Sequence, residues 1–260
     1  MSTVAHQTEI PGVDHIRRFL AYAGGLAMLL MDSCRYVFTL RFRFSEVMHQ
    51  VYFLGVQSWP IIILTSLFTG MVISLEAAAQ AVAYGFATFI GGTVASGEVR
   101  ELGPMLTGIV FAGRAGAAVT AQLGSMVVTE QVEALQSMGV SPAKVLVAPR
   151  LLACIITVPM LTIFADIVGV LGGLYMAEWQ VRLSPTIYWR SVQQMVVMDD
   201  FYKGLFKAAV FGLIVALVAC FEGLRARGGA EGVGKVTTSA VVTAIILIFA
   251  FNFVLSFLFF

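Results

Sequence analysis

Five charged residues lie in or beside long apolar stretches of the sequence, where charge is chemically costly: Arg100, Glu101, Arg114, Asp166 and Lys207. A charge at the centre of a bilayer costs roughly 2.5–3.5 kcal/mol on insertion scales, so such residues are functional candidates by default. Arg100 and Glu101 are adjacent and face different directions on a helix, so each needs a partner, a cavity or an interface. We therefore expect this pair to be functional.

The other three charges have simpler interpretations. Arg114 lies towards the cytoplasmic half of its stretch, where a long side chain can extend its charge to the interface. Asp166 and Lys207 occupy different apolar stretches and can pair with each other across two helices. We predict that this pairing is structural.

Enzyme chemistry is not indicated. No Ser-His-Asp or metal-ligand arrangement is present, and the histidines all precede the first long apolar stretch: His6, His15 and His49. The cysteines lack metal-ligand or disulfide spacing and are interpreted as small buried hydrophobic residues: Cys34, Cys154 and Cys220. We expect no catalytic residues, no metal and no cofactor.

A lookalike of a phosphate-binding loop occurs at Gly229 to Val236, whose sequence GAEGVGKV matches G-x-x-x-x-G-K. The Ser or Thr that holds magnesium is missing at Val236, and Thr237 comes one place late. A true loop also follows a strand in an α/β domain, whereas this segment lies in an expected loop, Glu222 to Thr238, between two apolar stretches. We therefore expect no ATP binding at this segment.

Composition defines the protein class. Of 260 residues, 59% are hydrophobic and only 12% are charged, well below the ~25% charged residues of soluble domains. The net charge of +1 gives no basic field for nucleic acid. The start, Met1 to Pro11, lacks a basic segment followed by an apolar core, so we predict no removable signal. The chain is predicted to be an all-α integral membrane protein.

A bilayer core requires about 20 apolar residues in a helix, and five segments qualify: Val51 to Leu75, Leu102 to Val128, Leu151 to Ala177, Gly204 to Phe221, and Ser239 to Phe260. The uncharged but Ala- and Gly-rich segment Ala77 to Gly97 is interpreted as the weakly hydrophobic end of the first span plus a turn. We predict five transmembrane helices in a domain covering residues 51–260.

The N-terminal 50 residues are predicted to form a cytoplasmic segment with an amphipathic interfacial helix. Its apolar run, Phe19 to Met31, is too short to cross a bilayer. Basic residues flank the run, which favours a position along the membrane surface: Arg17, Arg18, Arg35, Arg41 and Arg43.

The distribution of basic residues predicts the orientation. With the N-terminus in the cytoplasm, ten loop Lys and Arg lie inside and three lie outside. The positive-inside rule favours this arrangement, which places the C-terminus on the far side of the membrane.

Small residues recur every four positions in the second span, which predicts close helix packing in lipid: Gly108, Ala112, Gly116, Thr120 and Gly124. A second row lies beside them: Gly113, Ala117 and Ala121. The sequence does not say whether the partner helix belongs to the same chain.

A short amphipathic helix is predicted at residues 129–139, on the cytoplasmic side between the second and third spans. Thr129 is expected to cap its start and Gly139 to end it in a left-handed conformation. Its apolar positions fall on one face at helical spacing. It is either an ordinary interfacial connector or a peg that docks into a soluble partner.

Several motifs together resemble the MlaE/YrbE permease family, the membrane subunits of MCE-type ABC transporters. They are RELGP at Arg100 to Pro104, FAGRAGAAVTAQLGSM at Phe111 to Met126, EQVEAL and MGVSP within Glu130 to Pro142, and APR at Ala148 to Arg150. The resemblance covers roughly residues 15–260.

The resemblance implies a specific assembly. Two permease chains pair, two ABC ATPase subunits bind below them, and a ring of MCE-domain proteins lies on the periplasmic side. Phospholipid moves between the inner membrane and that ring. The helix at residues 129–139 would couple to the ATPase through Glu130, Gln131, Glu133, Leu135, Gln136 and Met138.

The resemblance also implies a lipid site between the two permeases. Local matching assigns it Ile73, Tyr84, Arg100, Glu101 and Leu102, with Lys207 as a further charged candidate. Asn252 departs from the pattern, because some members carry Asp there, which puts any salt bridge at that position in doubt.

Two alternatives from other functional classes stay open. A secondary transporter would use Asp166, Lys207 and Glu101 as an ion or proton relay, although five spans without an inverted repeat argue against it. A membrane scaffold would use the row of small residues for assembly alone. Co-purification of an ATPase would separate both from an ABC permease.

Overall fold

The computed structural model describes residues 11–38, 44–84 and 87–259, and this part of the chain forms helices and short turns without strands. Five helices or helical runs in it are long and apolar enough to cross a membrane: Trp59–Ala81, Ala87–Val128, Ala143–Val181, Met198–Gly223 and Gly229–Phe259. The predicted all-α membrane fold with five spans is confirmed.

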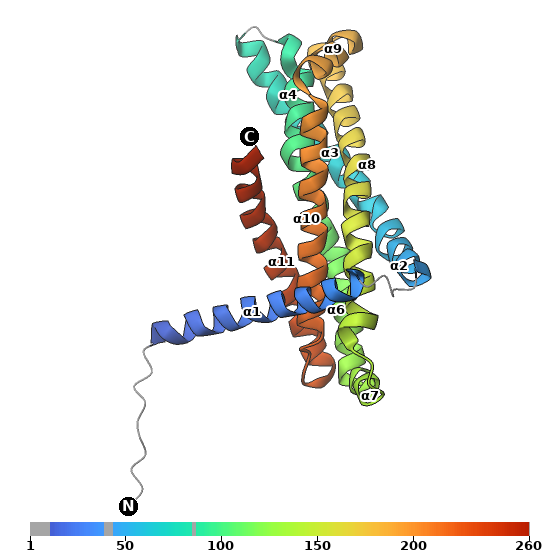
Figure 1. Ribbon diagram of the computed structural model, residues 1–260. Coiled ribbons are helices and arrows are strands. Elements are labelled where there is room, and N and C mark those ends of the chain that lie inside the picture. The colour runs from blue at the N-terminus through green and yellow to red at the C-terminus, as the bar shows by residue number, and fades with distance from the viewer. Residues whose placement is uncertain (1–10, 39–43, 85–86, 260) are drawn as a thin grey trace, which may run out of the picture.

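The spans consist of α3 (Trp59–Tyr84), α8 (Ala148–Val181), α10 (Met198–Gly223), α11 (Gly229–Phe259) and one interrupted run. That run, the second span, joins η2 (Ala87–Phe89), α4 (Ile90–Gly97), η3 (Glu98–Leu102), α5 (Gly103–Phe111), η4 (Ala112–Gly116) and α6 (Ala117–Val128). In Figure 1 α3, α8, α10 and the second span run alongside one another, with α11 leaning against one side.

Short helices lie at both ends of this bundle. Figure 1 shows α7 (Gln131–Ser137) at the same end as the turn between α10 and α11, whereas α9 (Pro185–Met195) lies at the opposite end. The π-helical turn η5 (Ala143–Val147) leads into α8. The spans therefore alternate in direction, as the predicted topology requires.

The boundary between the first two spans differs from the prediction. The first span begins at Trp59 rather than Val51 and continues to Tyr84. Residues Ile90 to Gly97 form α4 and open the second span instead of closing the first. The prediction was wrong because it relied on the weak hydrophobicity of this segment. The Ala and Gly residues of α4 pack against protein, and Gly91, Gly92, Val94 and Ala95 are buried there.

The later spans extend beyond their predicted limits. The predicted loop Glu222 to Thr238 is mostly helical, because α10 continues to Gly223 and α11 already begins at Gly229. Phe260, the predicted last residue of the fifth span, lies outside the described residues. The turn between the spans therefore comprises only residues 224–228.

The predicted row of small residues packs against helices of the same chain. A Cβ atom added to Gly116 would lie 3.0 Å from Val215 of α10, and one added to Gly108 would lie 3.2 Å from Phe211. Thr120 donates a hydrogen bond to the Ala219 carbonyl at 3.2 Å. The second row differs, since nothing lies within 4 Å of a Cβ built on Gly113.

A very close backbone approach joins α3 and α8. A Cβ on Gly70 would lie 1.9 Å from the carbonyl oxygen of Gly169, so only glycine fits at this crossing. Ser74 supports the same crossing by donating a hydrogen bond to the Gly173 carbonyl at 2.7 Å. Close packing of this kind holds helices together in lipid, where hydrophobicity provides no preference for protein over lipid tails.

The N-terminal helix α1 (Pro11–Phe38) is longer than the predicted run and crosses the bundle at a steep angle in Figure 1. It packs on α10 through Tyr22, whose ring meets Phe221 edge-on at 5.1 Å between centroids. Arg17 and Arg35 are exposed, whereas Arg41 and Arg43 lie outside the described residues. These features agree with an interfacial helix.

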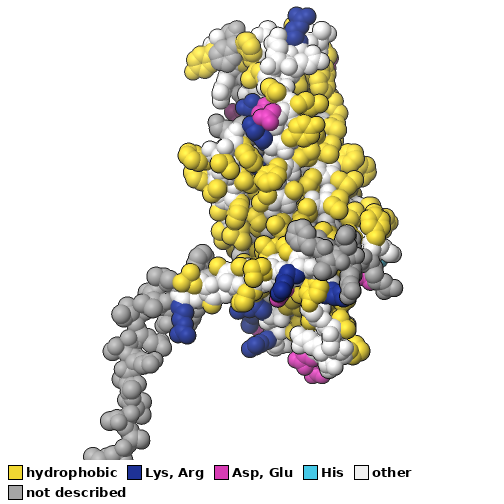
Figure 2. Space-filling model, viewed as in Figure 1, with side chains coloured by type: hydrophobic (Ala, Val, Ile, Leu, Met, Phe, Trp, Pro, Cys, Tyr) yellow, Lys and Arg dark blue, Asp and Glu magenta, His cyan; other side chains and the backbone are white. Residues whose placement is uncertain are grey.

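Figure 2 shows hydrophobic side chains over the middle of the visible face, with most basic side chains near α1 and the lower end. Of the three free cysteines, Cys154 and Cys220 are buried and Cys34 is partly buried, which confirms their role as packing residues.

Candidate functional site

The charged residues of RELGP lie on η3, a single π-helical turn. They lie inside the second span, because α4 continues directly into η3; the predicted start of that span at Leu102 was therefore wrong. This turn lies level with the first turns of α10 and the last turns of α11. Those two helices supply the side chains that form ion pairs and hydrogen bonds with it. π-Helical turns interrupt the regular hydrogen bonding of a helix and are frequent at functional sites.

Arg100 forms a salt bridge with Asp200 on α10, with 2.8 Å between Arg100 Nη2 and Asp200 Oδ2. The Asp200 side chain is only 7% exposed, whereas that of Arg100 is 37% exposed. Asp200 also accepts a 3.3 Å hydrogen bond from the backbone N–H of Val197 near the start of α10, where a negative charge is favourable. Asp200 therefore positions Arg100 and leaves part of its guanidinium accessible.

Glu101 forms the second ion pair, with Lys207 of α10 at 2.7 Å. The Lys207 side chain is 0% exposed and also donates hydrogen bonds to the Arg100 carbonyl at 2.9 Å and to Ser256 at 2.8 Å. Three oxygens thus compensate one buried ammonium group. The two bridges share η3 and α10, so we call Arg100, Glu101, Asp200, Lys207, Asn252 and Ser256 the polar cluster.

The last helix, α11, completes the polar cluster. Asn252 donates a hydrogen bond to the second carboxylate oxygen of Glu101 at 3.0 Å, and Ser256 donates to the same oxygen at 2.9 Å. Asn252 cannot supply the salt bridge that an Asp would, but it retains a neutral contact with the same cluster. Helices α10, α11 and η3 are therefore joined through charged and amide side chains.

The predicted pairing of Asp166 with Lys207 was wrong. Lys207 pairs with Glu101, and Asp166 lies on α8 beside Gly103 and Glu98. The rotation of a buried helix about its axis decides which charges meet, and span hydrophobicity does not reveal it.

Sequence reasoning missed Asp200, Ser256 and Glu98. Asp200 precedes the predicted fourth span, Gly204 to Phe221, although an acid in the first turn of a helix is a recognisable signal. Ser256 lies one turn after Asn252, and that spacing on a helix in a membrane could have indicated a shared polar face. Glu98 is fully buried but had been placed outside the second span.

The other predicted lipid-site residues are more widely spread. Ile73 on α3 packs at the edge of a hydrophobic cluster built from α3, α4, α8 and α9. Tyr84 at the end of α3 is 75% exposed, and Leu102 on η3 is partly buried. The structure thus groups Arg100, Glu101 and Lys207, whereas a lipid-binding role for Ile73, Tyr84 and Leu102 stays a prediction.

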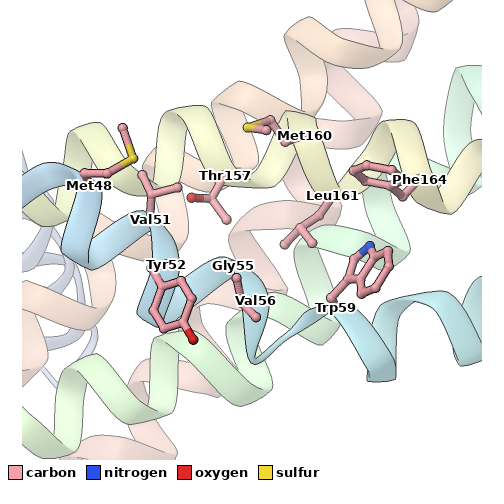
Figure 3. A pocket seen from close by; sticks show the side chains of 10 residues that line it. All are labelled: Met48, Val51, Tyr52, Gly55, Val56, Trp59, Thr157, Met160, Leu161 and Phe164. Carbon is pink, nitrogen blue, oxygen red and sulfur yellow. The ribbon is translucent and has the colours of Figure 1, made fainter.

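A separate apolar groove lies between the segment that precedes α3 and the middle of α8 (Figure 3). It has a volume of about 510 Å³, and Trp59 and Phe164, which lie at one end in the view, meet edge-on at 5.7 Å. None of the predicted lipid-site residues lines it. Its lining lacks charged side chains, so the polar cluster is the stronger candidate for recognising a lipid head group.

Arg114 stabilises the break in the chain before α3. Its guanidinium donates hydrogen bonds to the Phe53 and Leu54 carbonyls at 3.2 and 3.3 Å and to Ser58 at 3.1 Å, and it also bonds Gln57. These carbonyls belong to η1 (Tyr52–Val56), which follows α2 (Phe44–Val51) and ends just before α3, and the last carbonyls of a helix have no intrahelical donors. Arg114 is therefore anchored to backbone and does not simply extend towards water.

The predicted short helix between the second and third spans exists as α7, shorter than predicted at both ends, whereas its coupling role stays a prediction. Thr129 does not cap its start: it ends α6 by donating to the Ser125 carbonyl at 2.9 Å, while Glu130 takes a left-handed φ of 60°. Gly139 ends the segment with φ +74°, as predicted. Val132 is buried and Leu135 partly buried, and the remaining predicted coupling residues are exposed: Glu130, Gln131, Glu133, Gln136 and Met138.

A cleft of about 700 Å³ lies between α7 and the turn before α11. Glu130 and Glu133 line one side, and Arg225 and Arg227 line the other. This end of the molecule therefore carries a charged, recessed surface outside the spans. The lookalike phosphate loop, Gly229 to Val236, lies entirely in the helical beginning of α11, which excludes a phosphate-cradling loop there.

Comparison with known proteins matches residues 47–258 to the permease MlaE family. The chain belongs to the MlaE permease family. A probable ABC transporter permease of Synechocystis is 42% identical over 215 residues, covering 83% of this chain and 82% of the relative.

Other relatives of this MlaE-family permease have more specific names. The intermembrane phospholipid transport system permease protein MlaE of Haemophilus influenzae is 36% identical over 219 residues, or 84% of each chain. The chloroplastic protein TRIGALACTOSYLDIACYLGLYCEROL 1 of Arabidopsis thaliana is 36% identical over 206 residues, which cover 79% of this chain and 59% of the relative. The chain is thus an ABC transporter permease that spans the membrane.

Proposed function

We propose that this permease moves phospholipid between the bacterial inner membrane and a periplasmic ring of MCE-domain proteins, driven by a separate pair of ABC ATPase subunits. The polar cluster on η3, α10 and α11 carries the proposal. The name of the Haemophilus influenzae relative supports phospholipid as the substrate. ATP is expected to bind the ATPase subunits, and this chain itself is expected to need no cofactor.

Arg100 is the residue best placed to receive a lipid phosphate. Its side chain is 37% exposed, and its salt bridge with Asp200 fixes its position. A guanidinium can donate two parallel hydrogen bonds to phosphate oxygens. Lys207 is fully buried, so in this state it acts through Glu101 and not on the head group directly.

The acyl tails need a larger apolar wall than one chain provides. The face of α11 around the polar cluster is apolar and exposed, with Phe253 73%, Phe257 85% and Leu258 72% exposed. A second copy of the chain is expected to cover part of this face, so that the lipid lies between two permeases. Ile73, Tyr84 and Leu102 would contribute to that cavity.

The charged end of the molecule is proposed to dock on the ATPase. Val132 and Leu135 anchor α7 to the membrane bundle, whereas Glu130, Glu133 and Gln136 project from it. A rigid helix fixed on one side and polar on the other can transmit motion from a soluble partner. With this end in the cytoplasm, the N-terminus is also cytoplasmic and the C-terminus is periplasmic.

A crosslinking experiment tests the lipid site. Photo-reactive residues introduced at Tyr84 and Leu102 in the assembled transporter are expected to capture phospholipid, whereas one introduced at Ile246, on the exposed face of α11, reports ordinary annular lipid. Arg100→Ala is expected to reduce lipid transfer at least tenfold while the complex with the ATPase remains intact. Equal labelling at all three positions together with normal transfer by Arg100→Ala would contradict the site.

A charge reversal tests the coupling surface. Glu133→Lys on α7 is expected to weaken co-purification with the ATPase or to uncouple ATP hydrolysis from lipid transfer, because it inverts an exposed charge at the proposed interface. Glu178→Lys, also exposed but near the end of α8, is the matched control and should leave both properties unchanged. If both variants behave like wild type, α7 is a connector and not the docking helix.

A further inference from the structure

Two buried carboxyl groups lie behind the polar cluster and take no part in it. Glu98 on η3 is 0% exposed, and Asp166 on α8 is 5% exposed. Within the described part of the chain, neither carboxyl oxygen of Glu98 has a hydrogen-bond partner, and neither does Asp166 Oδ1. Isolated carboxylates in such surroundings would carry a large desolvation penalty.

Both groups lie at one contact, where α8 packs against the junction of η3 and α5. A Cβ atom on Gly169, one turn after Asp166, would lie 2.4 Å from Glu98 Oε1. A Cβ on Gly103 would lie 1.8 Å from Asp166 Oδ1 and 3.0 Å from the Glu98 carbonyl oxygen. The two glycines thus open space on facing helices, and each carboxyl group enters the space left by the glycine opposite. The two carboxyl groups also interact electrostatically.

The nearby cations already have other anions as partners. On η3 itself, Arg100 bridges to Asp200 and Glu101 to Lys207, so the charges of α10 face the polar cluster. From α9, Tyr188 approaches Glu98, and its hydroxyl donates to the Val170 carbonyl at 3.1 Å.

Among the described residues, the further basic groups of the surrounding elements lie elsewhere: Arg190 of α9 is exposed, and Lys203 of α10 pairs with Asp199. Glu76, the acidic residue of α3, is exposed and therefore does not belong to the buried pair. Burial raises the pKa of the Tyr188 hydroxyl, with Glu98 as an additional cause, so this residue stays neutral. No described basic side chain forms a salt bridge with Glu98 or Asp166.

We propose that Glu98 and Asp166 form a proton-binding pair inside the membrane bundle, in which a shared proton replaces the missing cation. A protonated carboxyl group can donate a hydrogen bond, so the pair supplies the donor that its orphan oxygens lack. Two carboxyl groups that share a site do not both ionise readily, because like charges repel strongly where the dielectric is low.

Loss of the proton would displace the polar cluster. Glu98 precedes Arg100 and Glu101 on the same π-helical turn, so repulsion between Glu98 and Asp166 would push η3 away from α8. The shared proton holds η3 against α8, and this contact weakens as the pH rises. The proton site itself does not depend on the proposed lipid transport; only its effect on transport does.

Infrared spectroscopy of the purified full-length chain tests the pair directly. Wild-type protein is expected to show a protonated carboxylic-acid carbonyl band from a buried group. That band should be lost in both Glu98→Gln and Asp166→Asn and should persist in Glu178→Gln, which changes an exposed carboxyl group of α8. Absence of the band in wild type, or its persistence in both variants, would overturn the proposal.

A second measurement avoids the variants in case they fold poorly. Wild-type protein whose Asp carboxyl carbons carry ¹³C should show an isotope shift in part of the buried acid band, because Asp166 shares the proton. The melting temperature of wild type should also fall as pH rises, and more steeply than that of the double variant E98Q/D166N if the latter folds. A band without any isotope shift would remove Asp166 from the pair and refute the proposal.

Discussion

Loss of either partner of the Glu101–Lys207 salt bridge should destabilise the protein to a different extent, because the two side chains differ in burial. Lys207 is 0% exposed and Glu101 is 36% exposed. Replacing Glu101 with Leu leaves a fully buried ammonium group whose remaining partners are the neutral oxygens of the Arg100 carbonyl and Ser256. Removing one partner of a buried pair typically costs about 3–5 kcal/mol, and we expect a loss of this size in the free energy of unfolding.

The reciprocal change should be milder. Lys207→Met removes three hydrogen bonds but leaves Glu101 with donors from Asn252 at 3.0 Å and Ser256 at 2.9 Å. Because Glu101 is also partly exposed, its loss of a partner should cost less than in a fully buried pair. We expect the free energy of unfolding to fall by about 1–3 kcal/mol. The double variant should resemble Lys207→Met, because it no longer contains an uncompensated buried cation.

Reversible unfolding in mixed detergent micelles measures the three free energies. The matched control is the pair Glu231–Lys235, an (i, i+4) bridge whose side chains are 79% and 76% exposed. The same Leu and Met substitutions there should have little effect, because exposed pairs contribute little. The reasoning is refuted if Lys207→Met destabilises as much as Glu101→Leu, or if the two effects simply add in the double variant.

Two further predictions concern packing and topology. Gly70→Ala should destabilise the protein by about 1–3 kcal/mol, because its Cβ would lie 1.9 Å from the Gly169 carbonyl oxygen; Gly113→Ala, which meets nothing within 4 Å, is the control in the same unfolding assay. In a cysteine-free background, impermeant thiol reagents applied to intact cells should label a cysteine at Ser184 but not one at Gly228, since the α9 end is predicted to face outside. Labelling of both from the same side would exclude the five-span topology.

Hydrophobicity was sufficient to predict the spans but not their ends. Three predicted cores lie within observed spans, and the fifth does so up to Phe259. The first began too early because residues 51–58 are apolar but broken by η1. The missing information was the hydrogen bonding of Arg114, which stabilises carbonyls far away in sequence. Helix breaks that depend on a distant side chain cannot be read from local composition.

The spacing of small residues was more informative than charge. Gly108, Gly116 and Gly124 were predicted to lie at a close contact, and each faces a side chain of the turn region, α10 or α11. Spacing along one helix defines a face, so this prediction needed no knowledge of the partner. Which charges pair also depends on how the partner helix is rotated about its axis, and spacing along one helix does not show this. For that reason Lys207 was assigned to Asp166 instead of Glu101.

Three charged residues lie within the single turn η3. A helix rotates by about 100° per residue, so Glu98, Arg100 and Glu101 point in different directions. Glu98 lies against α8, Arg100 reaches Asp200, and Glu101 reaches Lys207. Each residue therefore joins the turn to a different contact, and any shift of η3 must disturb all three together. A lipid phosphate at Arg100 and a proton at Glu98 would then influence each other through this shared turn, without direct contact between them.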